Sequence, residues 1–247
     1  MNKLSKQTKI LTLKINNIKM QELIEKLIDI IQNSSDKKLI YTPNSEIVVR
    51  AYDDKAFSEL LNRADYLVPD GAGLLLAARL IGEPLQERVA GFDLMRNLLR
   101  QAAGQDISFY FLGGKPGIID SAVTNIKSEL PELNMAGFHH GYLDQDLEES
   151  VIVDINEKQP DILLVGMGVP RQEKFFNKYF DELKIKVGLT VGGSFDVWAG
   201  EVDRAPLLMQ KLYLEWFYRL LQEPTRWKRM MAIPRFIYLV LKEKINT

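Results

Sequence analysis

Asp70 stands where a carboxylate could act as a general base. It follows the short apolar run Tyr66 to Pro69, which predicts a buried strand, and it precedes Gly71, which permits a sharp turn. A carboxylate at the carboxyl end of a strand, facing a cleft, can take a proton from a hydroxyl group and accelerate a reaction about 10²–10⁴-fold. The alternative is an N-cap for a helix predicted over 72–81. The sequence leaves both roles open.

Two glycine-rich loops follow other predicted strands. The strand 107–112 runs into Gly113-Gly114-Lys115-Pro116-Gly117, and the strand 187–191 runs into Gly192-Gly193-Ser194, with Asp196 close behind. Backbone N–H groups in such turns can approach a nucleotide's phosphates, and an acid near a strand end commonly binds ribose hydroxyls. A plain tight turn is the competing interpretation of both loops.

Two other nucleotide motifs are incomplete. Gly166-Met167-Gly168 begins like the dinucleotide fingerprint GxGxxG, but the third glycine position holds Arg171. No GxxxxGK[ST] sequence is present, which excludes a P-loop. Nicotinamide binding is therefore disfavoured.

Acids and histidines give no convincing metal site. Asp144-Gln145-Asp146 resembles the DxD sequence that holds a divalent metal in many transferases, but it precedes a predicted helix, 146–158, so an N-cap is the favoured role. His139-His140 is an adjacent pair whose rings should point apart in a strand, and no third ligand has suitable spacing. The absence of cysteine excludes disulfides and thiolate ligands. We expect no metal and no cofactor.

Short apolar strands alternate with amphipathic helices up to about residue 195. This pattern predicts an α/β fold, a Rossmann-like and mostly parallel sheet of about six strands with helices on both faces. The predicted strands are 39–41, 66–69, 107–112, 133–138, 162–165 and 187–191. The predicted helices are 19–32, 45–63 in one or two pieces, 72–81, 92–103, 118–129, 146–158 and 171–183.

Polar or glycine-rich loops follow most of these strands. In parallel sheets, ligands bind at the carboxyl ends of the strands, where such loops gather. We therefore expect five loops to converge on one cleft: 42–44, 70–71, 113–117, 166–172 and 192–196.

Composition changes after about Gly200. From Gly200 to Thr247 there are nine Lys or Arg, five Asp or Glu and seven aromatic residues. We predict a catalytic core over 1–199 and a C-terminal helical appendage over 200–247 that associates with a membrane. Arg226 and Arg229 share a helical face and, with Arg219, suit phosphate groups. The alternative is an interface between copies of the chain, a homo-oligomer.

Bulk properties limit the partners. The 247 residues are 46% hydrophobic and 26% charged, as in globular proteins, and a net charge of -1 gives no general attraction to nucleic acid. The polar N-terminus lacks the apolar core of a signal peptide, and no uncharged apolar run approaches the roughly 18 residues that span a bilayer. We expect a cytoplasmic protein, peripherally associated with the inner face of the cell membrane.

A set of motifs in order resembles the WecG/TagA/CpsF family of bacterial glycosyltransferases. The resemblance runs from about residue 10 to 230. It is carried by Thr42-Pro43-Asn44, Pro69-Asp70-Gly71, Arg88-Val89-Ala90-Gly91, Gly113-Gly114-Lys115-Pro116-Gly117, Gly166-Met167-Gly168-Val169-Pro170-Arg171-Gln172-Glu173, Val191-Gly192-Gly193-Ser194-Phe195-Asp196, Arg204-Ala205-Pro206, Leu214-Glu215-Trp216 and Arg219.

The resemblance implies a reaction and its partners. UDP-N-acetylmannosamine would donate its sugar to undecaprenyl-diphosphate-linked N-acetylglucosamine, giving a β-1,4 disaccharide on the lipid and UDP, in wall teichoic acid synthesis. The transfer would be inverting and metal-independent. A different donor, such as UDP-glucose or UDP-N-acetylmannosaminuronic acid, stays open, as does a nucleotide-binding membrane scaffold without catalysis.

The resemblance also implies roles for residues. Asp70 would be the general base on the acceptor's 4-hydroxyl. The sugar and diphosphate pocket would be lined by Thr42, Asn44, Arg88 and Gln172; the nucleotide would be held by Gly113, Gly114, Gly192, Gly193, Ser194 and Asp196; the diphosphates would be reached from the appendage by Arg219, Arg226 and Arg229.

Overall fold

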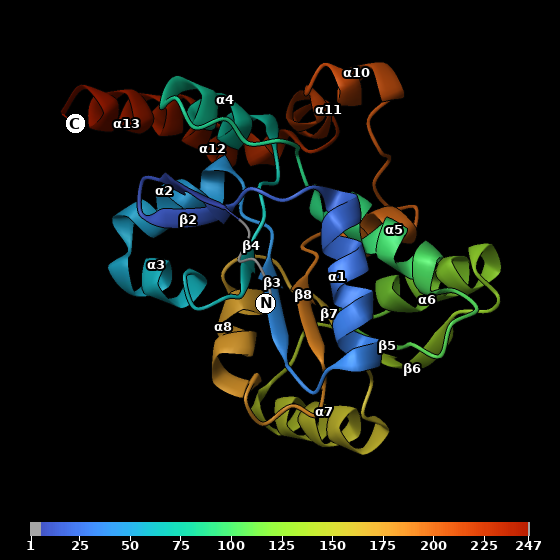
Figure 1. Cartoon of the computed structure of the whole chain (residues 1–247). Helices are drawn as coiled ribbons and strands as arrows, with labels where there is room; N and C mark the ends of the chain where they lie inside the picture. The colour runs from blue at the N-terminus through green and yellow to red at the C-terminus, as the bar shows by residue number, and fades with distance from the viewer. Residues whose placement is uncertain (1–5, 247) are drawn as a thin grey trace. The chain divides into compact units, whose positions relative to one another are not determined.

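The apolar strand segments form a parallel sheet, as the alternation with helices predicts. In this computed structural model the main sheet has six strands in the order β4-β3-β8-β7-β5-β6 (Figure 1). Their bounds are β3 Lys38–Tyr41, β4 Tyr66–Leu67, β5 Ser108–Gly113, β6 Asn134–His139, β7 Ile162–Gly166 and β8 Val187–Thr190. The pairings among β3, β8, β7, β5 and β6 are all parallel. Every residue of β7 and β8 is buried, as in strands covered on both faces. The predicted α/β class is confirmed.

The structure describes residues 6–246 and, within them, every side chain except those of Lys211, Arg226, Lys228 and Asn246. The helices are α1 Met20–Asn33, α2 Ser45–Asp53, α3 Lys55–Leu61, α4 Ala72–Leu80, α5 Gly91–Ala102, α6 Ile118–Glu129, α7 Gln145–Lys158, α8 Arg171–Tyr179, α9 Ser194–Trp198, α10 Leu207–Lys211, α11 Glu215–Gln222, the 3₁₀ helix η1 Pro224–Arg226, α12 Trp227–Met230 and α13 Ala232–Asn246. The helix expected over 45–63 divides at Asp54, whose carboxylate caps α3 by accepting from the N–H of Phe57.

An N-terminal hairpin escaped the sequence analysis. β1, Gln7–Ile10, pairs antiparallel with β2, Leu13–Asn16. Alternate side chains along both strands are buried. The turn between the strands contains no glycine, and Leu11 adopts a φ of 53° there. The usual hairpin turn residues are therefore missing, and only the two-residue alternation in a polar stretch signals these strands.

The chain divides into two compact units. The first comprises the described residues of Met1–Met20, Thr42–Ala90 and Asp203–Thr247; the second comprises Gln21–Tyr41 and Gly91–Val202. The expected boundary at residue 200 lies close to the junction between Val202 and Asp203. Residues beyond that junction nevertheless group with 42–90 rather than forming a unit of their own.

Within the first unit, α13 runs beside α2 and α4 (Figure 1). Phe236, Leu239 and Val240 form its buried face. Gly73 of α4 lies against α2, because a Cβ there would collide with the hydroxyl of Ser45, whereas it would be in ordinary contact with the Phe236 ring at 3.6 Å. Among the residues described, none of the helices is both long and apolar enough to cross a membrane.

Candidate active site

In the first unit, the loop that carries Asp70 is fastened to the loop 42–44. The N–H of Asp70 donates to the carbonyl oxygen of Pro43 at 2.9 Å. Gly71, with a φ of 100°, makes the turn into α4 and is the N-cap of that helix, which has no side-chain cap. Asp70 therefore does not adopt the capping role that the sequence left open. Its side chain is 30% exposed.

Arg88 faces Asp70 within the same unit. The N–H of Val89 donates to the carbonyl oxygen of Pro69 at 2.9 Å, which lays the Arg88 loop along the end of β4. The Nη2 atom of Arg88 lies 3.8 Å from the Oδ1 atom of Asp70, an ion pair longer than a hydrogen bond. The Arg88 side chain is 18% exposed, so this charge is held largely away from water.

The remaining first-unit residues of the predicted pocket lie in the loop 42–44. Thr42 is buried. The Oδ1 atom of Asn44 accepts from the N–H of Ile47 at 3.0 Å and so caps α2. Asn44 also lies against Gly71, where a Cβ would be 3.9 Å from its own Cβ. The structure thus brings Thr42, Asn44, Asp70 and Arg88 together.

In the second unit, three glycine-containing loops meet at the carboxyl ends of β5, β7 and β8. Gly113 pairs with Gly166 in the sheet, and the N–H of Gly114 donates to the carbonyl oxygen of Gly166 at 3.1 Å. A Cβ on Gly113, whose φ is 153°, would collide with the Gly166 backbone. A Cβ on Gly166 would lie 2.7 Å from the carbonyl oxygen of Gly192. We call the convergence of these three loops the glycine edge.

The buried side chain of Gln172 forms a hydrogen bond with the backbone of the glycine edge. Its Oε1 atom accepts from the N–H of Gly192 at 3.2 Å, and its Nε2 atom donates to the Glu173 carboxylate at 2.8 Å. Gln172 is only 2% exposed. Gln172 therefore orients the turn at Gly192.

Tyr41 lies beside Glu173. Burial, and then the nearby charge of Glu173, raise the pKa of Tyr41 far above its usual range, so this phenol stays neutral.

The other predicted nucleotide residues lie in the turn after β8. Ser194 is buried, and its hydroxyl donates to the carbonyl oxygen of Val191. Asp196, in the first turn of α9, is half-buried. Gly114, Gly192 and Gly193 are each partly exposed, so this edge presents backbone to solvent.

Comparisons with known proteins agree with the motifs. The model of the Glycosyl transferase WecG/TagA/CpsF family matches residues 8–247. A protein of Bacillus subtilis strain 168 is 40% identical over 208 residues, covering 84% of this chain and 80% of the relative. A protein of Staphylococcus aureus strain MW2 is 35% identical over 236 residues, covering 95% and 92%. Both are named N-acetylglucosaminyldiphosphoundecaprenol N-acetyl-beta-D-mannosaminyltransferase.

The chain belongs to the WecG/TagA/CpsF family of glycosyl transferases. It is therefore an enzyme of the glycosyltransferase class. Its predicted site residues fall into two groups, one in each compact unit. Asp70 and the arginines lie in the first unit, and the glycine edge lies in the second. That all five loops serve one cleft remains a prediction.

The acids and histidines of this WecG/TagA/CpsF member show one confirmed prediction and one correction. Asp144 caps α7 by accepting from the N–H of Leu147, as expected. The rings of His139 and His140 do not point apart; their centroids are 4.3 Å apart. The strand β6 ends at His139, so the alternation of a strand does not extend to His140. Within residues 6–246, no group of three or more His, Asp or Glu side chains could hold a metal ion.

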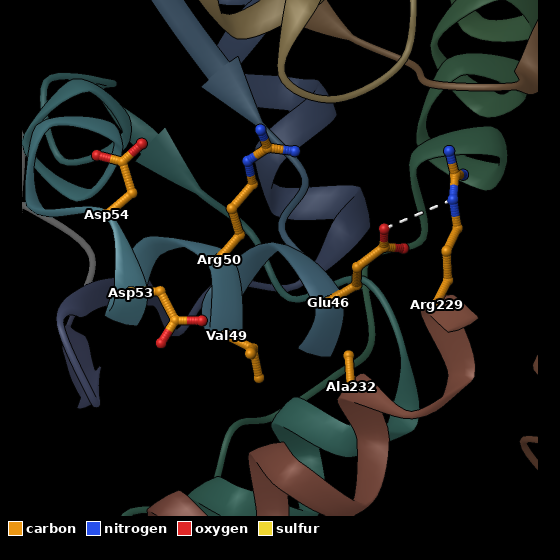
Figure 2. A pocket seen from close by; sticks show the side chains of 7 residues that line it. All are labelled: Glu46, Val49, Arg50, Asp53, Asp54, Arg229 and Ala232. Carbon is orange, nitrogen blue, oxygen red and sulfur yellow. Dashed lines mark ion pairs between the residues drawn. The ribbon is translucent and has the colours of Figure 1, made fainter. Parts of the chain in front are cut away.

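The predicted appendage cations are placed differently from one another. Arg229 lies 3.7 Å from Glu46 and lines a cavity of about 480 Å³ in the first unit (Figure 2). The lining residues are Glu46, Val49, Arg50, Asp53, Asp54, Arg229 and Ala232. Three carboxylates there disfavour an anionic ligand. Arg219 is half-buried on α11, and the Arg226 side chain lies outside those described.

Sequence reasoning missed Tyr142 and Arg171. The Tyr142 ring is 50% exposed and lies 5.2 Å from the Arg171 guanidinium, which donates to the carbonyl oxygen of Met167. The preceding residue, Gly141, donates its N–H to the carbonyl oxygen of Gly114 at 2.9 Å, so Tyr142 adjoins the glycine edge. A fixed, exposed ring can stack on a planar base. The available signal was an aromatic residue just beyond a strand's carboxyl end.

Proposed function

We propose that this chain transfers N-acetylmannosamine from UDP-N-acetylmannosamine to undecaprenyl-diphosphate-linked N-acetylglucosamine. Support comes from the names of the two relatives and from the family to which the chain belongs. The observation that carries the chemistry is the partly exposed Asp70 carboxylate, excluded from helix capping and held at a sharp turn beside Arg88.

The proposed step is a single inverting displacement. The acceptor's 4-hydroxyl oxygen forms a bond to C1 of the donor sugar on the face opposite UDP. The bond from C1 to the diphosphate oxygen breaks, and UDP leaves with its electron pair. The hydroxyl proton passes to Asp70, which acts as the general base. The product is a β-1,4-linked disaccharide on the lipid.

The two groups of residues divide this work. Backbone N–H groups at the glycine edge hold the nucleotide, with Tyr142 against its base and Asp196 near its ribose. Arg88 neutralises charge beside the reacting sugar, with Thr42 and Asn44 alongside it. Arg219, Arg226 and Arg229 reach the diphosphates from the C-terminal segment, and Arg229 must leave its ion pair with Glu46 to do so. The proposal requires that both groups serve one donor molecule.

The C-terminal segment, residues 200–247, meets the membrane in this proposal. A polyprenyl acceptor cannot leave the bilayer, so the enzyme must come to the inner face of the cell membrane. Large apolar side chains are exposed on α10, at its C-cap and on α11 and α12, with Leu207 73% exposed. They are Leu207, Leu208, Leu212, Trp216, Phe217, Leu221 and Trp227. Interspersed with cations, they suit an anionic lipid surface.

A UDP-release assay tests the reaction. Several UDP-sugars are offered with a lipid-diphosphate-linked N-acetylglucosamine acceptor, with and without EDTA. UDP-N-acetylmannosamine should give the highest kcat/KM, and EDTA should leave the rate unchanged. A higher kcat/KM with UDP-glucose, or a rate that collapses with EDTA, would contradict the proposal.

A vesicle test addresses the membrane role. The protein should sediment with vesicles containing anionic lipid, and Leu207→Asp combined with Leu208→Asp should weaken that binding. If vesicles do not bind and the double substitution instead changes the oligomeric state, this surface is an interface between copies of the chain.

A further inference from the structure

Glu215, the first residue of α11, lies between two arginines of the first unit. One carboxylate oxygen contacts the Nη1 atom of Arg88, and the other lies 3.9 Å from the Nε atom of Arg204. The Glu215 side chain is 22% exposed. The two motifs Arg204-Ala205-Pro206 and Leu214-Glu215-Trp216, to which the proposed mechanism gives no role, are therefore joined by an ion pair.

Arg88 is consequently shared between two carboxylates. Glu215 is in direct contact with its Nη1 atom, whereas Asp70 stands 3.8 Å from its Nη2 atom. A guanidinium keeps its proton in proteins and presents a planar set of donors. Because an unpaired buried charge is destabilising, a largely buried guanidinium is paired with a carboxylate. The closer partner here is Glu215, from the C-terminal segment, and not the proposed base.

The position of Arg88 affects whether the carboxylate oxygens of Asp70 can accept a proton. A bidentate bond from Arg88 would occupy the carboxylate oxygens that must accept the proton of the acceptor's hydroxyl group. At 3.8 Å the Nη2 atom of Arg88 stabilises the charge of Asp70 but is farther from Oδ1 than a hydrogen bond allows. Holding Arg88 at this distance keeps the guanidinium from occupying both carboxylate oxygens.

We propose that Glu215 is a positioning residue for the transfer reaction. It draws the Arg88 guanidinium toward α11 and keeps it from closing on Asp70. This inference rests on the proposed role of Asp70 as the base. The segment that carries Glu215 is itself fastened, since the Nε2 atom of Gln210 donates to the carbonyl oxygen of Ala205 at 2.6 Å, next to Arg204.

The test is Glu215→Gln, which keeps the shape of the side chain and removes its charge. Arg88 then turns to Asp70, and kcat should fall about 10- to 100-fold, less than the full contribution of a general base because Asp70 is impaired and not removed. The KM for the UDP-sugar should stay within about threefold of the wild-type value, because Asp70, the group that is impaired, is used only in the chemical step. Glu215→Asp, which retains the charge, should recover part of kcat.

Asp53→Asn is the matched control. Asp53 forms a bidentate ion pair with Arg235 of α13 at 2.6 and 2.7 Å, which also attaches the C-terminal segment within the first unit. This substitution should leave kcat near that of the wild type. If Asp53→Asn lowers kcat as much as Glu215→Gln, general loosening of the segment explains the loss and the positioning role is wrong.

A crystal structure of Glu215→Gln separates this inference from the proposed function. The distance between Arg88 Nη2 and Asp70 Oδ1 should close from 3.8 Å to about 2.9 Å. An unchanged distance with a wild-type kcat overturns the positioning role. If the wild type transfers no sugar, the proposed function fails, whereas the Arg88–Asp70 distance in the variant still decides what Glu215 does. Should the variant not fold, Glu215→Asp provides the same comparison through its intermediate kcat.

Discussion

The two compact units form their parts of the site differently, the first from charged side chains and the second from backbone. In the first unit, side-chain charges do the work: Asp70, Arg88, Glu215 and Arg204 alternate in sign along one chain of ion pairs. In the second unit, the glycine edge is made of backbone, and at Gly113 and Gly166 the strand ends are packed so tightly that a methyl group would not fit. A single substitution can change a side-chain charge and keep the backbone in place, whereas a side chain at Gly113 or Gly166 would displace the backbone itself.

Asp70→Asn should give the largest effect and the sharpest contrast. An amide cannot accept the hydroxyl proton, so kcat should fall about 10²–10⁴-fold. The affinity for UDP, measured by calorimetry, should remain close to that of the wild type, because the second unit is untouched. A variant that keeps its turnover would show that Asp70 is not the base, and a wild type that binds UDP but transfers no sugar would identify a non-catalytic nucleotide-binding scaffold.

Gly113→Ala should damage the second unit in the opposite way. The added Cβ meets the Gly166 backbone at a φ of 153°, which side chains rarely adopt, so the loop must shift. We expect destabilisation of about 1–3 kcal/mol, seen as a lower Tm, together with weaker UDP binding. Gly82→Ala is the control, since Gly82 also has a positive φ but nothing lies near an added Cβ. Equal losses in both variants would mean that backbone strain alone, and not the close packing of the loops, is responsible.

Tyr142→Ala should have a smaller effect, confined to binding. Loss of a stacked ring typically costs on the order of 1 kcal/mol, or about fivefold in UDP affinity. Tyr142→Phe should bind like the wild type, because only the ring face is used. If Phe binds as weakly as Ala, the hydroxyl rather than the ring makes the contact.

Asp154→Asn should have the smallest effect, a modest loss of stability that is present near neutral pH and disappears at low pH. Burial alone would raise the pKa of Asp154, but hydrogen bonds from Lys158 and Tyr110 outweigh it and lower the pKa. A lowered pKa means stabilisation that is present above the unfolded value and lost as pH falls through the folded value. The Tm of the wild type should thus decline more steeply than that of the variant as pH falls below about 4. Parallel curves would contradict this.

The elements and single caps could be predicted from sequence because their signals are local. Apolar runs and helical spacing placed the strands and helices, and Asp144 was correctly expected to cap α7. The hairpin was missed because its turn, at Leu11, lacks the residues that usually mark one. Nothing local indicated that Gln172 would be buried as a brace for Gly192, or that Glu215 would reach Arg88. Such pairings depend on the tertiary fold.

The docking of α13 has a consequence for biosynthesis. α13 packs against both α2 and α4 and buries Phe236, so these two helices lack this cover until the chain has been made beyond residue 236. Domains generally fold as the chain leaves the ribosome, and every residue of the second unit precedes Asp203. The first unit must wait for Asp203 onwards. During translation, a nearly finished chain can therefore already have the glycine edge while Arg88 has not yet met Glu215.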